Sequence, residues 1–486
     1  MRTFKRVDTD DLRFFETLMP GRVFSGEAIS TDYDHDEMTE YGHFMPEAVL
    51  QAVSADEISK VLAYCNDKEI AVTPRGAGTG LCGGSVAIHG GVILSSEKMK
   101  NVIEVDVKNM TATVEPGVLL MEFPKALEGT GLFYPPDPGE KTASMGGNVM
   151  TNAGGMRAVR YGVTRDYVLG MQVVLADGRI VEMGGKNVKS SSGYSLVDLM
   201  IGSEGTLGFL TRMTVKLIPE PKANLSLLIP FDDLDACISA VPEVLACGCE
   251  PTAVEFMERE VISCAETYLG KQFPDNSADA YLLVRLDGAS MDALRPSMDA
   301  LTDLALGLGA KDVLMADTDE RKESIWSARG AFLEAIKGST SAMDECDVVV
   351  PRDRIAAFVR ATREISERYD IRICSFGHAG DGNLHVYVCR DALEESVWKE
   401  RVEKAMNDMY ASARAMGGDV SGEHGIGHAK KPFLMEAVGE TQMELMRGIK
   451  AAFDPKGILN PGKVVECNDD QDPPFGRLSG GFLFCN

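Results

Sequence analysis

The sequence predicts an α+β protein built from at least two packed units, and three observations support this prediction. Its 486 residues exceed what one ordinary hydrophobic core accommodates. Residues 101–220 consist of short β-branched segments separated by turns, a pattern typical of strands. From about residue 222 to residue 416, longer helical patterns alternate with strands, which predicts an antiparallel sheet whose helices cover one face.

Composition narrows the class of protein. Hydrophobic residues make up 44% of the chain and charged residues 25%, as in folded proteins. The formal net charge of −25 argues against nucleic acid or an anionic membrane as a partner, because both would repel this surface. No stretch approaches the roughly 18 apolar residues of a membrane span, and the first residues lack the apolar core of a signal peptide. We therefore expect a cytoplasmic protein without an integral membrane segment.

The eleven cysteines are scattered and include no CxxC run. An iron–sulfur cluster or a zinc ribbon within this chain is therefore not expected. Their thiols are expected to be reduced in the cytoplasm. If the protein removes electrons from a substrate, those electrons must pass to an acceptor outside the chain.

The first half contains a few elements with clear boundaries. A capping box at Ser54 predicts a helix that begins there, because an apolar residue recurs at helical spacing after it. Residues 70–73, 111–115 and 171–175 are predicted strands. Asp177-Gly178 predicts a hairpin turn after the last of these.

The second half alternates strands with longer helices. The predicted strands are 225–230, 281–286, 311–314 and 371–376. The predicted helices are 234–246, 291–308, 352–369 and 392–416, and the last is stopped by two glycines. A further helical segment after Pro432 leads to residue 453, and the last twenty or so residues are expected to form a loosely ordered tail.

A glycine-rich loop follows the strand at 70–73. Residues 78–83 match GxGxxG, but the chain then continues with glycine and β-branched residues, where a dinucleotide fold of the Rossmann type requires a long helix. The alternative is a loop whose successive backbone N–H groups wrap a diphosphate directly. A plain glycine-rich turn stays open for this loop alone. Two further runs of small residues, at 142–155 and 202–208, favour a cofactor that passes close to the backbone.

Two segments near the C-terminus, 376–385 and 421–428, hold four of the chain's seven histidines. Glycines between the histidines let the backbone turn tightly and bring several side chains to one point. Residues 384–388 alternate as a strand, which places His385 at its start. The pattern predicts a metal bound beside a general base, and the competing interpretation is a pair of glycine-rich loops that carry incidental histidines.

Seven motifs, in this order, resemble those of one family. They are PRGAGTG (74–80), PPDPGEKTASMGGNVMTNAGG (135–155), YGVTRDYV (161–168), GSEGTLG (202–208), FGHAGDGNLH (376–385), SGEHGIG (421–427) and FDPKGILNPGK (453–463). The chain resembles the FAD-linked oxidoreductases of the vanillyl-alcohol oxidase superfamily, in the branch of D-lactate dehydrogenases and glycolate oxidase large subunits. The resemblance covers residues 15–463.

This resemblance implies a PCMH-type FAD-binding domain, an antiparallel-sheet α+β cap domain for the substrate, and a C-terminal segment that returns to the flavin. The expected boundaries are 1–220 for the FAD-binding domain with its core at 40–219, 221–416 for the cap, 417–463 for the C-terminal segment and 464–486 for the tail.

The resemblance also implies which residues bind FAD. They are Arg75, Gly76, Ala77, Gly78, Thr79 and Gly80 at the pyrophosphate, Pro135, Ser144, Gly147, Asn148, Gly154 and Gly205 at the adenosine and flavin, and Asn460 from the C-terminus. Members that attach FAD covalently often carry histidine in the first loop. Since this chain has Gly76-Ala77-Gly78 there, we expect FAD to be bound without a covalent link.

For the second half, the resemblance implies that His378, His385 and Glu423 ligate one divalent metal ion, with zinc, iron and manganese not distinguished. His424 would be the catalytic base. Arg329 matches the position where related enzymes bind the substrate carboxylate, and a surface arginine is the alternative. His428 has no implied role.

The implied reaction is oxidation of a 2-hydroxy acid to the 2-keto acid, with D-lactate as the expected substrate. The motifs at 135–168 are most similar to those of lactate dehydrogenases of anaerobes, which pass electrons to a two-subunit electron-transferring flavoprotein and can couple lactate, NAD and ferredoxin. Alternatives are a glycolate oxidase with iron–sulfur subunits, a D-2-hydroxyglutarate dehydrogenase, an oxidase that uses oxygen, and a subunit that only transfers electrons.

Overall fold

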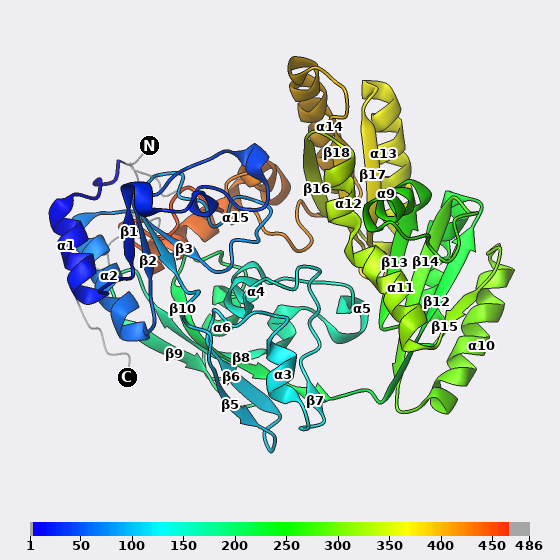
Figure 1. Cartoon of the computed structure of the whole chain (residues 1–486), viewed down its shortest axis with the longest axis horizontal. Coiled ribbons are helices and arrows are strands. Elements are labelled where there is room, and N and C mark those ends of the chain that lie inside the picture. The colour runs from blue at the N-terminus through cyan, green and yellow to red at the C-terminus, as the bar shows by residue number, and fades with distance from the viewer. Residues whose placement is uncertain (1–2, 466–486) are drawn as a thin grey trace, which may run out of the picture.

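The computed structural model describes residues 3–465, and its N-terminal half contains two sheets side by side (Figure 1). A four-stranded sheet has the order β1 (Val23–Ser25), β2 (Ala48–Gln51), β4 (Val92–Ser95) and β3 (Val72–Arg75), with β4 parallel to both of its neighbours. A five-stranded antiparallel sheet has the order β5 (Val102–Asp106), β6 (Thr111–Val114), β10 (Phe209–Lys216), β8 (Val168–Val174) and β9 (Ile180–Gly184). A short ribbon pairs β7 (Leu132–Phe133) with β11 (Ile218–Pro219).

The helix predicted after Ser54 is present as α2 (Ala55–Lys68). The Ser54 side chain accepts a hydrogen bond from the backbone N–H of Glu57, which satisfies one of the free donors of the first turn. Its apolar residues pack with β2, β3 and β4 in one core. The other helices of this half are short apart from the first, and they are α1 (Thr9–Leu18), α3 (Phe123–Leu127), α4 (Met145–Thr151), α5 (Ala158–Tyr161) and α6 (Leu196–Met200).

The second half is built on a seven-stranded antiparallel sheet. Its order is β15 (Leu314–Ala316), β12 (Ala223–Phe231), β14 (Ala280–Gly288), β13 (Ala253–Glu258), β17 (Arg372–His378), β18 (Asn383–Cys389) and β16 (Met343–Val349). The chain enters this sheet through the short link between β11 and β12, visible at the bottom of Figure 1.

Helices cover both faces of this sheet, so the expectation that they cover one face is wrong. Consecutive residues of β12 face opposite sides and both are buried: Leu227 lies in one core and Leu228 in the other. The first core contains residues of α7 (Leu234–Ser239), α8 (Val241–Ala246), α10 (Met291–Gly307), α13 (Ile355–Tyr369) and α14 (Glu395–Ala415). The second contains residues of α9 (Arg259–Leu269), α11 (Asp319–Gly330) and α12 (Phe332–Ser339).

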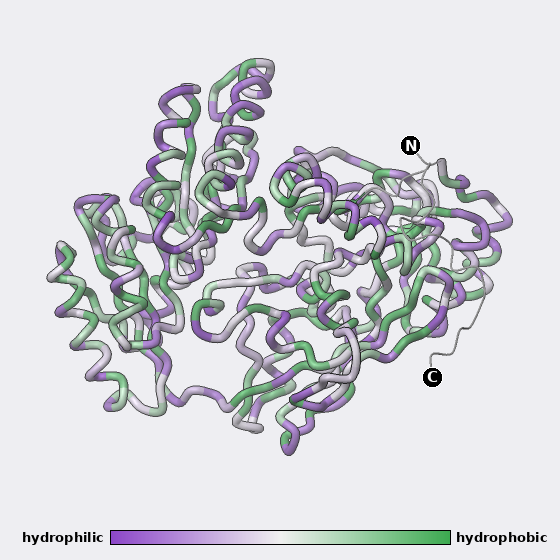
Figure 2. Tube along the Cα trace, turned by 180° about the vertical axis from the view of Figure 1, so that it is seen from behind, coloured by the Kyte–Doolittle hydropathy of each residue, from purple (hydrophilic) through white to green (hydrophobic). Residues whose placement is uncertain are grey.

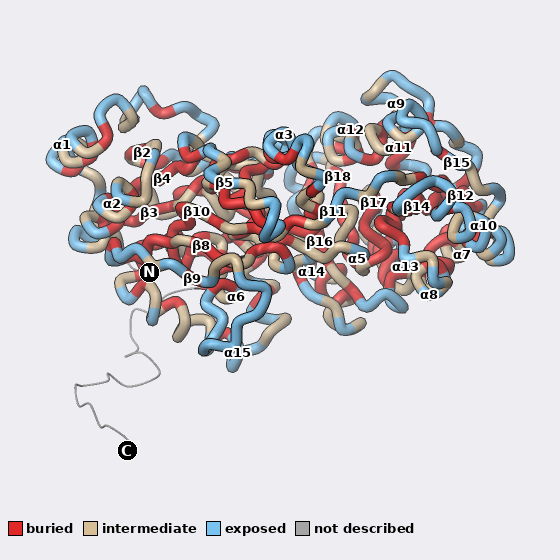
Figure 3. Tube along the Cα trace, turned by 90° about the horizontal axis from the view of Figure 1, so that it is seen from below, coloured by how far each residue is buried: buried red, intermediate tan, exposed pale blue. Residues whose placement is uncertain are grey.

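The figures agree with this layering. In Figure 3 the strands of the sheet are mostly buried while the outer sides of the helices are exposed. Figure 2 shows hydrophobic residues concentrated along the strands and hydrophilic residues on the peripheral helices and loops. Because both faces of each central strand are apolar, period-two alternation gave no sign of a second layer of helices.

Two predicted elements have different boundaries. The strand expected at 311–314 begins only at its last residue, as β15. The helix expected at 234–246 is two helices that meet at Ala240, and Pro242 follows there at the start of α8, where its missing N–H costs nothing.

The C-terminal segment crosses back to the first half, as Figure 1 shows for α15 (Lys431–Phe453). After this helix the backbone N–H of Asn460 donates to the carbonyl of Val72 in β3 at 2.7 Å. The buried Lys450 ammonium donates to the carbonyls of Thr206 and Leu459, each at 2.7 Å. The segment that follows α15 is thereby fixed against the four-stranded sheet, while the expected tail lies, from residue 466, outside the described residues.

Between residues 3 and 465, no helix combines the length and apolar character needed to cross a bilayer. The nine cysteines in this range are all free.

Candidate functional site

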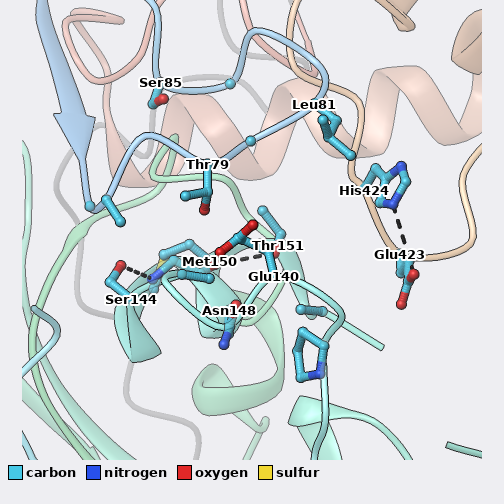
Figure 4. Close-up of a pocket in the computed structure, with 18 of the residues that line it drawn as sticks. Thr79, Leu81, Ser85, Glu140, Ser144, Asn148, Met150, Thr151, Glu423 and His424 are labelled. Atoms are coloured by element: carbon cyan, nitrogen blue, oxygen red, sulfur yellow. Dashed lines mark hydrogen bonds and ion pairs between the residues drawn. The ribbon is translucent and has the colours of Figure 1, made fainter. Parts of the chain in front are cut away.

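A cavity of about 320 Å³ lies between the two halves of the molecule, and the predicted site residues gather around it. Its walls include all three glycine-rich segments of the first half, together with α11, α12, β17, β18 and the loop that follows α14. Figure 4 shows Glu423 and His424 on that loop, across the cavity from Ser144 and Asn148.

The first glycine-rich loop lines the cavity from residue 74 to residue 82, and no helix follows it, as predicted. Arg75 lies beneath the loop and donates to the carbonyls of Asp32 at 2.7 Å and Ser85 at 3.2 Å. Gly78 has φ +81°, and a Cβ there would lie 2.3 Å from the Arg75 guanidinium. Arg75 thus packs against the loop and fixes its shape, and the loop presents its backbone to the cavity.

The second run places Ser144 and Asn148 on opposite ends of the first turn of α4. Ser144 caps this helix by accepting the N–H of Gly147 at 3.1 Å. The Asn148 side chain lines the cavity, and its buried amide nitrogen has no hydrogen-bond partner among residues 3–465. Buried polar atoms are rarely left unpaired, so this amide is suited to a ligand with acceptor atoms. Gly147 and Gly205 also line the cavity.

Three residues expected to contact the cofactor lie behind the wall. Pro135 is buried but does not line the cavity. The amide of Asn460 donates to the carbonyls of Gly84 and Glu204, at 2.8 and 2.7 Å, and so braces two lining residues from behind. Gly154 packs against Glu423, because a Cβ at this position would lie 2.7 Å from a Glu423 carboxylate oxygen.

The atoms His378 Nε2, His385 Nε2 and Glu423 Oε1 form a nearly equilateral triangle. The His378–Glu423 and His385–Glu423 distances are 3.3 Å, and the distance between the two nitrogens is 3.4 Å. Ligands at about 2.0–2.1 Å from a tetrahedral ion are about 3.3 Å apart. The three donors therefore fit a shared divalent ion, and this donor set suits zinc, iron or manganese.

A hairpin brings the two histidines together. β17 ends at His378 and β18 begins at Asn383, and the N–H groups of Asp381 and Gly382 both donate to the His378 carbonyl. The glycines that were predicted to let the backbone turn tightly between the histidines thus lie in this turn.

Three buried carboxylates that the sequence analysis did not single out lie behind the imidazoles. Glu255 on β13 contacts His378 Nδ1 at 2.9 Å. Glu345 on β16 contacts His424 Nδ1 at 3.0 Å, and Asp347 lies two residues further along the same strand. All three have no exposed surface. Acidic residues inside otherwise apolar strands were the available sequence signal, because such strands rarely bury a charge without a reason.

The loop at 421–427 is held from both halves of the molecule. One Asp347 oxygen, Oδ2, accepts hydrogen bonds from the Ser421 hydroxyl and from the backbone N–H groups of the next three residues, at 2.9–3.2 Å. Glu204 of the first half accepts the N–H groups of Ile426 at 2.7 Å and Gly427 at 2.8 Å. Glu423 and His424 therefore have fixed positions although they lie on a loop.

Negative charge exceeds positive charge at this site. The carboxylates that contact the imidazoles are those of Glu255, Glu345, Asp347 and Glu423, and in the described chain the permanent cations that contact them are Arg329 and Lys430. With neutral histidines, two negative charges remain. Burial is expensive for such charges, and a divalent cation would compensate both.

The pKa values reflect the same imbalance. Burial alone would lower the pKa of His424. The carboxylates of Asp347 and Glu345 outweigh this effect and raise the pKa to about 9. Burial likewise lowers the pKa of His378, while Glu255 and Glu423 bring it well above its ordinary value. Both imidazoles thus attract protons in the absence of another cation.

Arg329 is 6% exposed and lines the cavity, so the alternative of a surface arginine is wrong. Its Nε donates to Glu255 at 2.8 Å, and its guanidinium lies 4.6 Å from the centre of the Phe376 ring. Glu255 thereby connects Arg329 with His378.

His428 lies apart from the triangle. Its imidazole packs over Gly83, where a Cβ would lie 2.3 Å from the ring. Burial and the ammonium groups of Lys463 and Lys431 lower its pKa to about 4. It is placed to shape the first glycine-rich loop.

Comparisons with known proteins agree with this architecture. Residues 46–184 match the family described as FAD binding domain, and residues 220–464 match the C-terminal domain of FAD linked oxidases. The chain is 48% identical to D-lactate dehydrogenase of Anaerostipes hadrus over 466 residues, which cover 95% of this chain and 98% of the relative. It is 40% identical to glycolate oxidase subunit GlcD of Bacillus subtilis, over 89% of this chain and 91% of the relative.

A solved structure of p-cresol methylhydroxylase with substrate bound has the same fold. The TM-score is 0.79 at 18% identity, over 96% of this chain and 100% of the other. The PCMH-type fold expected from the sequence is therefore confirmed.

Hydrogen exchange tests whether Asp347 holds the loop at 421–427 in place. In Asp347→Asn, the loss of the charged acceptor should speed exchange at the amides of residues 422–424 by about ten-fold, since hydrogen bonds to charged groups contribute about 1.5–3 kcal/mol. The amides of Ile426 and Gly427, which Glu204 holds, should change less. Asp353→Asn, at an exposed aspartate, is the control. Equal acceleration across 421–427 would contradict this assignment.

Proposed function

We propose that this member of the FAD-linked oxidase family oxidises D-lactate to pyruvate with the help of a divalent metal ion. The chain is an FAD-dependent hydroxy-acid dehydrogenase. The observation that carries the metal-assisted reaction is the triangle of His378, His385 and Glu423 with His424 beside it, at 3.8 Å from Glu423. Relatives named D-lactate dehydrogenase and glycolate oxidase support the substrate class.

Charge at the cavity favours a substrate with one carboxylate. The cationic residues on its wall, within the described chain, are Arg75 and Arg329. Arg75 already donates to backbone carbonyls behind the loop. Arg329 pairs with Glu255 through Nε and Nη2, so the donors proposed for the substrate are its remaining N–H groups. A guanidinium binds a carboxylate through two parallel hydrogen bonds and so fixes its orientation. A 2-hydroxyglutarate dehydrogenase would require a partner for a second carboxylate.

The neighbourhood of Arg329 favours lactate over glycolate. Leu333 and Phe376 both line the cavity, and Phe376 lies against the guanidinium. They offer an apolar surface to a substrate methyl group, which glycolate lacks. Glycolate oxidase activity is the second candidate function, because a relative of that name covers most of this chain.

The cavity residues fit FAD, and the donor triangle fits a divalent cation. Bound FAD supplies the hydride acceptor, and a bound cation supplies a Lewis acid for the substrate hydroxyl. The glycine-rich loop at 76–80 and the unpaired amide of Asn148 would hold FAD, without a covalent link. His378, His385 and Glu423 would hold the cation.

The chain's own residues orient the substrate and move one proton. Arg329 holds the carboxylate, so that the Cα–H bond points toward the side of the cavity where the flavin would lie. The hydroxyl proton passes to His424, the C–O bond becomes a carbonyl, and the Cα hydrogen leaves with its electron pair. His424 must be unprotonated for this step. A cation in the triangle would counter the carboxylates that raise its pKa.

The electron acceptor is proposed to be a separate two-subunit electron-transferring flavoprotein, with coupling to NAD and ferredoxin. This proposal rests on the motifs at 135–168. The nine free cysteines of the described residues include no pair spaced for a cluster, which agrees with an acceptor outside the chain.

Flavin reduction tests the role of His424. His424→Ala should bind FAD but lose its anaerobic bleaching by D-lactate, with a rate lower by about 10²–10⁴-fold, because the hydroxyl proton has no acceptor. The flavin absorbance after rapid mixing is the measurement. His89→Ala, which removes an imidazole that packs against Phe4, is the control and should bleach normally. Rapid bleaching of the His424 variant would refute the assignment.

Removal of metal tests the triangle. Dialysis of the FAD-loaded protein against a chelator should abolish bleaching by D-lactate while the flavin stays bound. The reason is that the residues proposed to hold FAD, the loop at 76–80 and Asn148, lie on different segments from the metal ligands. Added Zn²⁺, Fe²⁺ or Mn²⁺ should restore it. Elemental analysis should find about one metal ion per chain in the untreated protein and little in His378→Ala. Full bleaching by metal-free protein would exclude the metal-assisted reaction.

The acceptor can be identified by turnover. With D-lactate in air, the isolated protein should form little peroxide, and addition of a two-subunit electron-transferring flavoprotein should support continuous turnover. One peroxide formed per pyruvate would identify an oxidase instead. Co-purification with iron–sulfur subunits and no turnover with the flavoprotein would favour the glycolate oxidase type.

A further inference from the structure

Glu345 is a fully buried carboxylate for which the reaction described above has no task, yet both of its oxygens are engaged at the site. Oε1 accepts the Tyr387 hydroxyl at 2.7 Å, and Oε2 lies 3.0 Å from His424 Nδ1. We propose that Glu345 is a positioning residue that fixes the tautomer and the ring orientation of His424. This inference rests on the proposed role of His424 as the base.

The hydrogen bond determines which nitrogen can act. A carboxylate only accepts hydrogen bonds, so His424 Nδ1 must carry the proton that it donates to Glu345. In the neutral ring, Nε2 then holds the free electron pair. Nε2 is the nitrogen beside the triangle, 3.8 Å from Glu423 Oε1. The base therefore presents its accepting atom on the side where the substrate hydroxyl would be bound.

Neighbouring groups keep both partners from rotating. The His424 ring stacks on His385, with 5.1 Å between centroids and 14° between planes. The Tyr387 hydroxyl holds the other oxygen of Glu345, and Tyr387 itself is buried on β18 next to β16. A rotated imidazole would lose both the stacking and the hydrogen bond. Tyr387, Glu345 and His424 thus form a connected row, and the two residues at its ends, Tyr387 and His424, line the cavity.

The same carboxylate matters when the proton moves. The substrate O–H bond breaks and its proton goes to Nε2. The electron pair left on oxygen then completes the carbonyl as the Cα hydrogen leaves as hydride, which bound FAD would accept. The ring becomes an imidazolium whose positive charge lies next to the negative Glu345. Because the surroundings are buried, this pairing favours the proton transfer more than it would in water.

Asp347 provides a contrast on the same strand. Its Oδ2 accepts four hydrogen bonds from the loop backbone and Ser421, but it lies 3.8 Å from His424 Nδ1. Asp347 therefore holds the loop, whereas Glu345 holds the ring. Removing one or the other should give different defects.

Glu345→Gln tests the inference in the FAD- and metal-loaded protein. The amide keeps the size of the side chain but loses its charge and can offer an N–H in place of an acceptor. Flavin reduction at saturating D-lactate should slow by about 10²–10⁴-fold, the range that general base catalysis typically contributes. The D-lactate KM, the pyruvate affinity measured from the flavin spectrum, and the FAD and metal contents should stay within three-fold, about the scatter expected of uninvolved contacts.

Isotope effects separate this role from a structural one. In Glu345→Gln the proton transfer should limit the rate, so the effect of deuterated solvent on flavin reduction should rise and that of 2-deuterated lactate should fall. Tyr387→Phe, which removes one hydroxyl, should slow reduction by about ten-fold with the same trend. Asp347→Asn should instead alter metal content and loop exchange.

Each outcome decides the inference. Reduction by Glu345→Gln within three-fold of the unaltered protein, while His424→Ala is inactive, would overturn it and leave the proposed function intact. Loss of metal or of pyruvate binding in Glu345→Gln would also overturn it, since Glu345 would then be structural. Rapid reduction by His424→Ala would refute the proposed function itself.

Discussion

The fixed position of the loop at 421–427 is the constraint on which the rest of the site depends. This loop carries both Glu423 and His424, and loops are ordinarily the mobile parts of a fold. Here Asp347 of the seven-stranded sheet and Glu204 of the other half each accept several of its N–H groups. Hydrogen bonds to charged acceptors contribute more than neutral ones, so both halves help to hold the loop in place. The cavity is lined by residues of both halves, so its shape depends on how they pack together.

That arrangement has an electrostatic cost, which explains why the buried carboxylates come as a set. Placing one charge in an apolar interior is expensive, and Glu255, Glu345 and Asp347 are all fully buried. Each is compensated locally. Arg329 pairs with Glu255, and Lys430, three backbone N–H groups and the Ser421 hydroxyl surround Asp347. A tyrosine hydroxyl and an imidazole contact Glu345. The charge that remains is negative and lies at the cavity. A site of this kind attracts a cation and stabilises a proton, and the metal-assisted oxidation proposed above uses both.

Much of this could be predicted from the sequence, but only where function leaves a local pattern. The fold, the glycine-rich cradle and the interleaved histidines follow from residues close together in the chain, and α2 begins where its Ser54 cap predicts. The carboxylates behind the histidines could not be found in this way, because Glu255 contacts His378 and Arg329 across 123 and 74 residues. The second layer of helices was missed for a related reason: Leu227 and Leu228 are equally apolar, and only tertiary packing assigns them to different cores. Arg75 lines the cavity while its guanidinium donates to the carbonyls of Asp32 and Ser85, and these contacts depend on a side-chain direction that the sequence does not give.

The two halves contribute different chemistry, and this division bears on whether the protein could act only in electron transfer. The cavity wall of the first half consists largely of backbone and small side chains, and it is the part proposed to hold the flavin. The groups proposed to bind a cation or take up a proton come from the seven-stranded sheet and the loop at 421–427, and they are His378, His385, Glu423 and His424. A protein that merely carried electrons would need the cradle alone. It would gain nothing from four carboxylates whose burial destabilises the fold unless a cation compensates them. The buried charge thus argues for catalysis on physical grounds, independently of any likeness to known enzymes.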